Sequence, residues 1–308
     1  MLDLSFLSYA NSRTVLVGTV LLGLCAGVIG VMMMLRRKSL LGDAVAHAAL
    51  PGVCVAYLII GDRNFIAFLF GALVFGICAS GLIAFVRAHV RVKDDAITAI
   101  VIGGFFGIGI ALSRWIQNLP GGNRAGLDTF LFGKAAAMVK ADVELIVYVC
   151  LLVLALVVIF YKELAVSTFD REFAAVQGWP VKAIDFFLSV LVCAVTVVAL
   201  PAIGVVLVVA LLVIPAATAR FWTNSLATLL IMAGCIGAFS GALGSVLSAT
   251  LEAPSQTLSR GWPTGPMITL VAFSCFVISL LFAPRRGMIS HYFRLRRFRK
   301  DLQSARLN

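Results

Sequence analysis

The chain has 308 residues, of which 61% are hydrophobic and only 13% are charged, and its mean hydropathy is +1.05. This composition excludes a water-soluble globular domain and indicates a polytopic membrane protein. The formal net charge is +11, but the cations lie in short stretches beside apolar runs, which is typical of membrane topology and argues against nucleic-acid binding. The seven cysteines fall within apolar segments and form no CxxC pair, so we interpret them as core residues.

Nine apolar segments could cross a membrane as helices, since a span needs about 20 residues. In chain order they cover 14–35, 40–60, 65–87, 95–117, 142–161, 183–200, 202–218, 225–250 and 266–283. Only the Leu200–Pro201 break separates the sixth segment from the short seventh, so eight spans is the alternative. We predict an all-α bundle in one transmembrane domain, residues 1–308, with the bundle at 14–287 and a basic cytoplasmic tail at 288–308.

The basic clusters predict the orientation of these spans. With nine spans and the N-terminus outside, every large cluster falls on the cytoplasmic side, namely 36–38, 87–93, Lys162 with Arg171, Arg220, and 285–286 with the tail. The opposite loops carry fewer cations, namely Arg63, Arg114, Arg124 and Arg260. Because lysine and arginine are enriched in cytoplasmic loops, the pattern supports this threading and a cytoplasmic C-terminus.

Asp43 and His47 place a carboxylate and an imidazole at the start of the second apolar segment. They are four residues apart, so on a helix they share one face, and ionisable residues in a membrane segment indicate a functional site. Their oxygen and nitrogen ligands suit manganese, iron or zinc. The alternative is a structural pair in which the two side chains satisfy each other or a backbone carbonyl. Pro51 and Gly52, one turn further on, are predicted to kink or break the helix within the same path.

The polar segment 161–182 is predicted to form a short amphipathic helix on the cytoplasmic side. Ser167, Thr168 or Asp170 can cap it, and Gly178 followed by Pro180 ends it. Phe169, Phe173 and Val176 are expected to lie on one side of it. Two interpretations remain open, a docking surface for a soluble partner and an interfacial helix lying on the membrane.

Other motifs give little support for catalysis. The chain has no GxxxxGK[ST], HExxH or GxSxG sequence, and its three histidines are His47, His89 and His291. The segment 126–134 is predicted to be re-entrant or interfacial. A proton-coupled secondary cation transporter would explain Asp43 and His47 without any partner, but it would leave the 161–182 segment unexplained.

Several sequence blocks of the chain resemble the motifs of one known family. The stretch 41–52 (LGDAVAHAALPG) resembles the signature of the permeases of ABC importers for manganese, zinc or iron, the ABC-3 family. Further similar blocks follow in order at 94–110, 127–133 (LDTFLFG), 161–174 (YKELAVSTFDREFA), 214–220 (IPAATAR) and 282–287 (FAPRRG). The resemblance covers about 14–287.

This resemblance implies a permease of a bacterial inner membrane that is not itself an enzyme. Its implied partners are two copies of a cytoplasmic ATP-binding subunit, a second permease subunit, identical or paralogous, and an extracytoplasmic metal-binding protein. The manganese, zinc or iron ion is cargo, and no permanently bound cofactor is expected. Carried over by position, Asp43 and His47 are the metal-path residues, and 169–178 is the helix that docks on the ATPase. The docking residues are Phe169, Asp170, Arg171, Glu172, Phe173, Ala174 and Gly178.

Two stretches depart from the family pattern. The link at 252–266 is longer than usual and is expected outside, where it could contact the binding protein. The basic tail is also extended, and an anionic-lipid anchor is the simpler interpretation of it.

Overall fold

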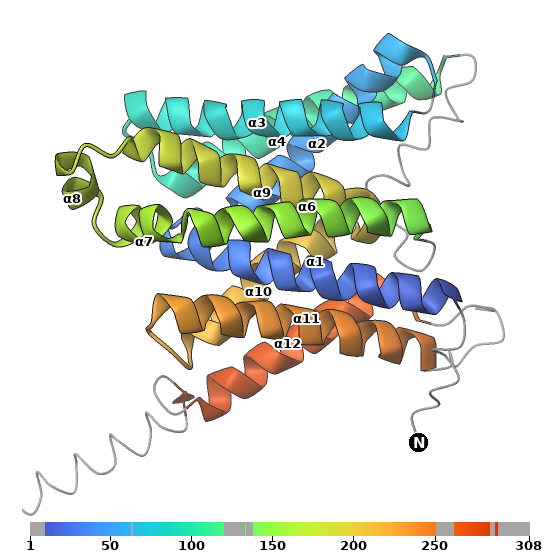
Figure 1. The fold of residues 1–308 in the computed structure, drawn as a ribbon. Helices are drawn as coiled ribbons and strands as arrows, with labels where there is room; N and C mark the ends of the chain where they lie inside the picture. Colours follow the sequence, from blue (N-terminus) through green and yellow to red (C-terminus); the bar gives the residue numbers. More distant parts are fainter. Residues whose placement is uncertain are drawn as a thin grey trace, which may run out of the picture.

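The computed structural model describes residues 10–62, 64–119, 133, 138–250, 262–283, 287 and 288. The regular secondary structure within them is entirely helical (Figure 1). The helices are α1 (Ala10–Leu35), α2 (Leu41–Ile60), α3 (Phe65–His89), α4 (Asp94–Gln117), α6 (Lys140–Ile159), α7 (Tyr161–Phe169), α8 (Arg171–Val176), α9 (Val181–Ile203), α10 (Val205–Arg220), α11 (Leu226–Thr250) and α12 (Thr264–Phe282). The all-α prediction is therefore confirmed.

Each predicted span corresponds to one long helix or to α10, and the boundary between the sixth and seventh spans differs. Eight helices in the described part are long and apolar enough to cross a membrane, and α10 is a shorter apolar helix of 16 residues. The chain changes direction at Gly204, where φ is 79°, and not at the predicted Leu200–Pro201 break. Pro201 lies inside α9. A positive φ suits glycine, whereas a proline near a helix end leaves the following residues free to stay helical.

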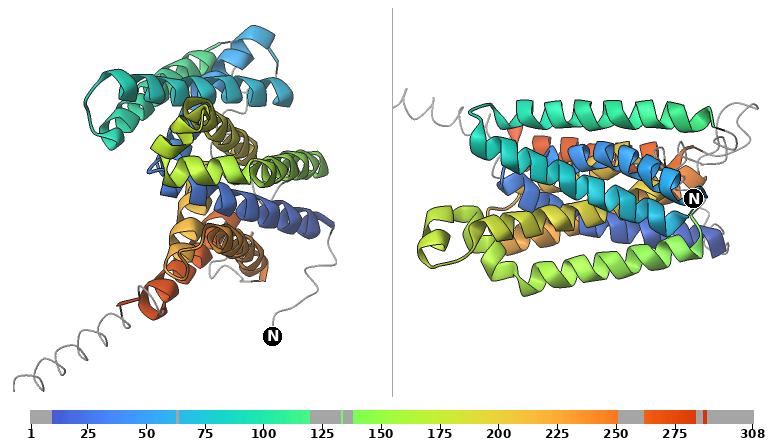
Figure 2. Two further views of the ribbon diagram at one scale, coloured as in Figure 1. Left: turned by 60° about the vertical axis from the view of Figure 1, so that its left-hand side comes forward. Right: turned by 90° about the horizontal axis from the view of Figure 1, so that it is seen from above.

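The long helices form two groups with α6 and α9 between them. On one side α2 packs on α3 and α4, and on the other α1, α10, α11 and α12 pack together. Between them, α9 contacts α2, α3 and α1, and α6 contacts α1 and α9. The short α8 projects beyond the long helices in the view from above (Figure 2). The helix that carries Asp43 and His47 is thus surrounded by α3, α4 and α9.

Small residues set the closest helix contacts. A Cβ atom on Gly23 of α1 would lie 2.2 Å from the Gly237 carbonyl oxygen of α11. One on Gly52 of α2 would lie 2.3 Å from the Gly71 carbonyl oxygen of α3. Such backbone contact supplies the dispersion energy that holds helices together in lipid, where burial of apolar surface contributes little.

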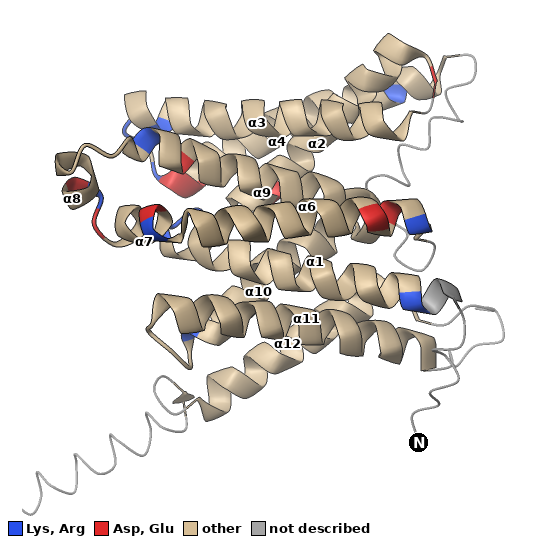
Figure 3. Ribbon diagram, in the orientation of Figure 1, with Lys and Arg blue, Asp and Glu red and all other residues tan. Residues whose placement is uncertain are grey.

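Basic residues gather at one end of the bundle, around α7 and α8 (Figure 3). In the described residues this end carries Arg36, Arg37, Lys38, Arg87, Arg91, Lys93, Lys162, Arg171, Lys182 and Arg220. The opposite ends of the same helices carry Arg13, Arg114 and Lys140. The helices therefore run alternately between a strongly basic end and a weakly basic end, as the predicted threading requires.

Candidate functional site

The second helix brings Asp43 and His47 together as their spacing predicts. Asp43 lies in the first turn of α2, and one turn later His47 Nε2 lies 3.4 Å from Asp43 Oδ1. The side chains are 30% and 26% exposed, in a helix whose other residues from Leu41 to Ala56 are mostly buried. The pair is therefore open to something outside its own helix, which a purely internal structural pair would not require.

His47 contacts an aromatic ring, and one of its own ring nitrogens has no hydrogen-bond partner. The ring of Phe106 from α4 lies edge-on to the imidazole, with 4.9 Å between the ring centroids. The buried Nδ1 atom of His47 has no hydrogen-bond partner in the structure. Buried ring nitrogens usually have a partner, so this atom is a second available donor or acceptor at the pair.

Within the described part of the chain, Asp43 and His47 have no third potential metal ligand beside them. No group of three or more His, Cys, Asp or Glu side chains among the described residues could hold a metal ion. A metal bound by Asp43 and His47 would keep water or take ligands from another chain. Such an open site suits an ion that must be released.

The prediction for Pro51 and Gly52 is a kink or a break, and a break is absent, because α2 continues through both residues to Ile60. Proline lacks an N–H group, so the carbonyl of His47, four residues earlier, loses its usual helical donor. The local effect of Pro51 is thus one carbonyl without its helical bond beside the pair, and not an interruption of the helix.

The segment between α6 and α9 forms two short helices in place of the single predicted one. Phe169 ends α7, and Asp170 caps α8 by accepting a hydrogen bond from the Phe173 backbone N–H at 2.8 Å. α8 ends at Val176 and Gly178 follows with a φ of 81°, so the predicted stop is confirmed.

The predicted docking residues of this segment divide into an outer and an inner set. The side chains of Phe169, Phe173 and Val176 are exposed. Ala174 is fully buried and cannot contact a partner, because its small side chain faces the bundle. Arg171 is half-exposed and faces α9, where its Nη2 atom lies 3.0 Å from Asp185 Oδ2.

Sequence reasoning missed a charged cluster around Asp185 at the basic end. Arg36, whose side chain is 0% exposed, pairs with Asp185 and also donates to Ser167 Oγ at 2.6 Å and Thr168 Oγ1 at 2.9 Å. Burial lowers the pKa of Arg36, and the Asp185 carboxylate opposes that shift. An arginine remains charged under such conditions. The sequence does show Asp185 near the start of an apolar span, and this acidic residue could have indicated the cluster.

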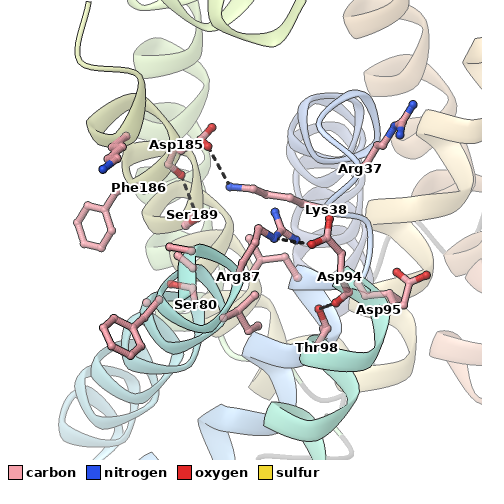
Figure 4. A pocket seen from close by; sticks show the side chains of 18 of the residues that line it. Arg37, Lys38, Ser80, Arg87, Asp94, Asp95, Thr98, Asp185, Phe186 and Ser189 are labelled. Atoms are coloured by element: carbon pink, nitrogen blue, oxygen red, sulfur yellow. Dashed lines mark hydrogen bonds and ion pairs between the residues drawn. The ribbon is translucent and has the colours of Figure 1, made fainter. Parts of the chain in front are cut away.

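This cluster borders a cavity of about 460 Å³ between α2, α3, α4 and α9 (Figure 4). Lys38 points across it to Asp185, and Arg87 pairs with Asp94 at 2.8 Å on the α3–α4 side. Leu40 also lines it, so the cavity begins one turn before Asp43.

The other residues considered in the sequence analysis lie away from the Asp43–His47 pair or outside the described residues. His89 Nδ1 lies 2.8 Å from the Phe85 carbonyl oxygen at the basic end. All seven cysteines are free, and five are at least partly buried. His291, the tail beyond residue 288, most of the 252–266 link and all of the 126–134 segment except Gly133 lie outside the described residues.

Comparisons with known proteins agree with this architecture. A model of the ABC 3 transport family matches residues 8–283. The chain is 40% identical to the manganese transport system membrane protein MntC of Bacillus subtilis, over 96% of this chain and 66% of that protein's length. It is 39% identical to the zinc transport system membrane protein TroC of Treponema pallidum, over 92% of this chain and 93% of that protein.

A solved structure is also similar. A chain of PsaBC from Streptococcus pneumoniae, determined in complex with Fab, matches with a TM-score of 0.78 and 31% identity, over 95% of this chain and 99% of that chain. These comparisons give no support to a proton-coupled secondary transporter. The chain belongs to the ABC 3 transport family and is a multi-pass membrane permease of the ABC type.

Proposed function

We propose that this permease carries a divalent manganese or zinc ion across the membrane, from an extracytoplasmic binding protein to the cytoplasm. The observation that carries the proposal is the Asp43–His47 pair, a carboxylate and an imidazole 3.4 Å apart and partly exposed within a membrane helix. Relatives 40% and 39% identical are named for manganese and zinc transport, and both ions accept this ligand set. Iron is the third candidate.

The ion needs ligands beyond those of one chain, and we propose that a second permease subunit, identical or paralogous, supplies them. On α4, which carries Phe106 beside His47, a Cβ added to Gly103, Gly104 or Gly107 would meet nothing within 4 Å. Small residues allow two membrane helices to approach closely. A second permease packed near this open face of α4 would bring its own ligands toward Asp43 and His47.

Energy for transport would come from two copies of a cytoplasmic ATP-binding subunit, since no ATP-binding motif occurs in this chain. The exposed apolar residues of α7 and α8 are proposed to dock on it. The basic end of the bundle then faces the cytoplasm, with the N-terminus outside, in a bacterial inner membrane. ATP binding would close the ATPase pair and rock the two permease bundles, which opens the path alternately to the two sides.

Metal uptake by cells that carry the whole transporter tests the role of the pair. Asp43→Ala and His47→Ala are compared with Asp95→Ala and His89→Ala, matched substitutions at the basic end outside the pair. Manganese, zinc and iron contents are measured together by elemental analysis, and membrane levels of each variant are checked. We expect uptake of one metal to fall at least about ten-fold in the pair variants only, because a ligand is lost.

The opposite result is equally informative. If the pair variants accumulate all three metals at the wild-type rate, Asp43 and His47 are a structural pair and the metal path lies elsewhere.

A further inference from the structure

The turn between α1 and α2 has an unusual backbone. Arg37 has a φ of 57° and is the only non-glycine residue with positive φ in the described part of the chain. Around it, the Lys38 N–H donates to the Met33 carbonyl at 2.9 Å and the Arg37 N–H to the Met34 carbonyl at 3.1 Å. This is a helix C-terminal motif whose left-handed position glycine usually fills. Holding an arginine there requires support from the surrounding structure.

Asp185 supplies that support from both sides of Arg37. Its carboxylate pairs with Arg36 and lies 3.6 Å from the Lys38 ammonium through Oδ2. The residues before and after the strained position are therefore bound to one carboxylate of α9.

The same cluster also binds the α7–α8 segment. Arg36 donates to Ser167 and Thr168 of α7, and its Nη2 atom lies 3.3 Å from the Leu164 carbonyl oxygen. Arg171 of α8 reaches Asp185 at 3.0 Å. Because Arg36 is completely buried, separating it from these partners would leave an uncompensated charge, so the turn and the segment are expected to move as one unit.

The turn leads directly into the helix of the Asp43–His47 pair. The first α2 N–H, that of Leu41, donates to the Lys38 carbonyl at 3.0 Å, and Asp43 follows in the same turn of helix. We propose that Asp185, through Arg36 and Lys38, is a positioning residue that couples displacement of the α7–α8 segment to the placement of Asp43 and His47. This inference rests on the proposed function, because it assigns the route by which ATPase movement reaches the metal pair.

The test uses the complete transporter, with its ATPase and binding protein, reconstituted in vesicles. Mn²⁺ uptake and ATP hydrolysis are measured in the same preparation, and the readout is the number of ions carried per ATP. Asp185→Asn removes the charge and keeps the shape. Asp94→Asn is the matched control, since it removes a carboxylate from the Arg87 ion pair at the same end of the bundle. Asp185→Glu tests for rescue by the charge.

We expect Asp185→Asn to keep hydrolysing ATP while the ions carried per ATP fall at least about five-fold, the lower range of measured coupling energies. Asp94→Asn should keep the wild-type ratio, and Asp185→Glu should recover part of it. A residue that only stabilises the fold would reduce the amount of assembled transporter and leave this ratio unchanged. A wild-type ratio in Asp185→Asn therefore overturns the proposal.

A second variant covers the case in which Asp185→Asn does not assemble. Lys38→Gln removes the outer contact and leaves the buried pair, and we expect the ratio to fall about two-fold. A wild-type ratio in Lys38→Gln would then count against the coupling route. Failure of the proposed function is distinguishable, because wild-type vesicles would then show no ATP-driven uptake of manganese, zinc or iron at all.

Discussion

Arg37 shows most directly how single residues of this chain are constrained by their neighbours. A left-handed conformation costs a side chain with a Cβ atom about 1–2 kcal/mol, and glycine avoids that cost. The side chain of Arg37 is exposed and reaches the edge of the cavity, whereas its neighbours Arg36 and Lys38 both pair with Asp185. The backbone conformation at 37 therefore depends on its neighbours more than on its own side chain.

Substitution of Arg37 measures that constraint. Arg37→Gly should leave the unfolding temperature of the purified chain in detergent unchanged or raise it, because about 1 kcal/mol of strain is relieved. Arg37→Val, a β-branched residue in the same conformation, should lower it. Equal unfolding temperatures for the two variants would show that the turn relaxes away from positive φ.

The residues of the candidate site differ in how far sequence could predict them. The i, i+4 spacing of Asp43 and His47 predicted their contact, since both lie on one helix. The Arg36–Asp185 pair joins residues 149 positions apart, and spacing along one helix carries no information about it. The contact between His47 and Phe106 likewise depends on how α2 packs on α4.

At the scale of elements, α8 carries the most exposed large apolar side chain of the described residues. Val176 is 88% exposed, and Phe173 and Phe169 are also exposed beside it. Buried Ala174 anchors the short helix to the bundle, and Arg171 ties it to α9. A small helix fixed in this way presents apolar side chains at low cost in conformational freedom.

Charge placed on this helix tests the docking proposal. Val176→Asp should weaken copurification of the permease with its ATPase by about 30-fold in affinity, the loss typical of a central interface residue. Ser225→Asp, which adds the same charge to the exposed α10–α11 link, is the control. Undiminished copurification with Val176→Asp would favour the other interpretation, an interfacial helix lying on the membrane.

The helical elements themselves were largely predictable, and their ends were less so. Apolar runs of about 20 residues located every long helix. Hydropathy could not tell that the chain turns at Gly204 instead of Leu200–Pro201, because both sites lie within apolar sequence. It also could not divide 161–176 into α7 and α8, since a single Asp170 cap makes that boundary.

At the scale of the whole molecule, the alternation of helix directions fixes which links share a side of the membrane. The α2–α3 link near Asp62 lies at the weakly basic end, and the α10–α11 link near Thr223 lies at the strongly basic end. This assignment depends on the short α10. If α10 did not cross the membrane, every later link would lie on the opposite side.

Single cysteines in a variant without the seven native ones test this threading in intact cells. A membrane-impermeant thiol reagent should label Asp62→Cys and should leave Thr223→Cys unlabelled until the membrane is opened. Labelling of both in intact cells would mean that α10 does not cross, and the eight-span alternative would then hold.

The proposed two-ligand site has a consequence for how such a transporter is built in the cell. An ion entering the membrane must exchange its water shell for protein ligands, and within the described residues no third His, Cys, Asp or Glu side chain joins Asp43 and His47. A newly inserted chain awaiting its partners would bind an ion too incompletely to conduct it. We therefore expect an orphan permease to be harmless to the metal balance of the cell, whatever order the subunits are synthesised in.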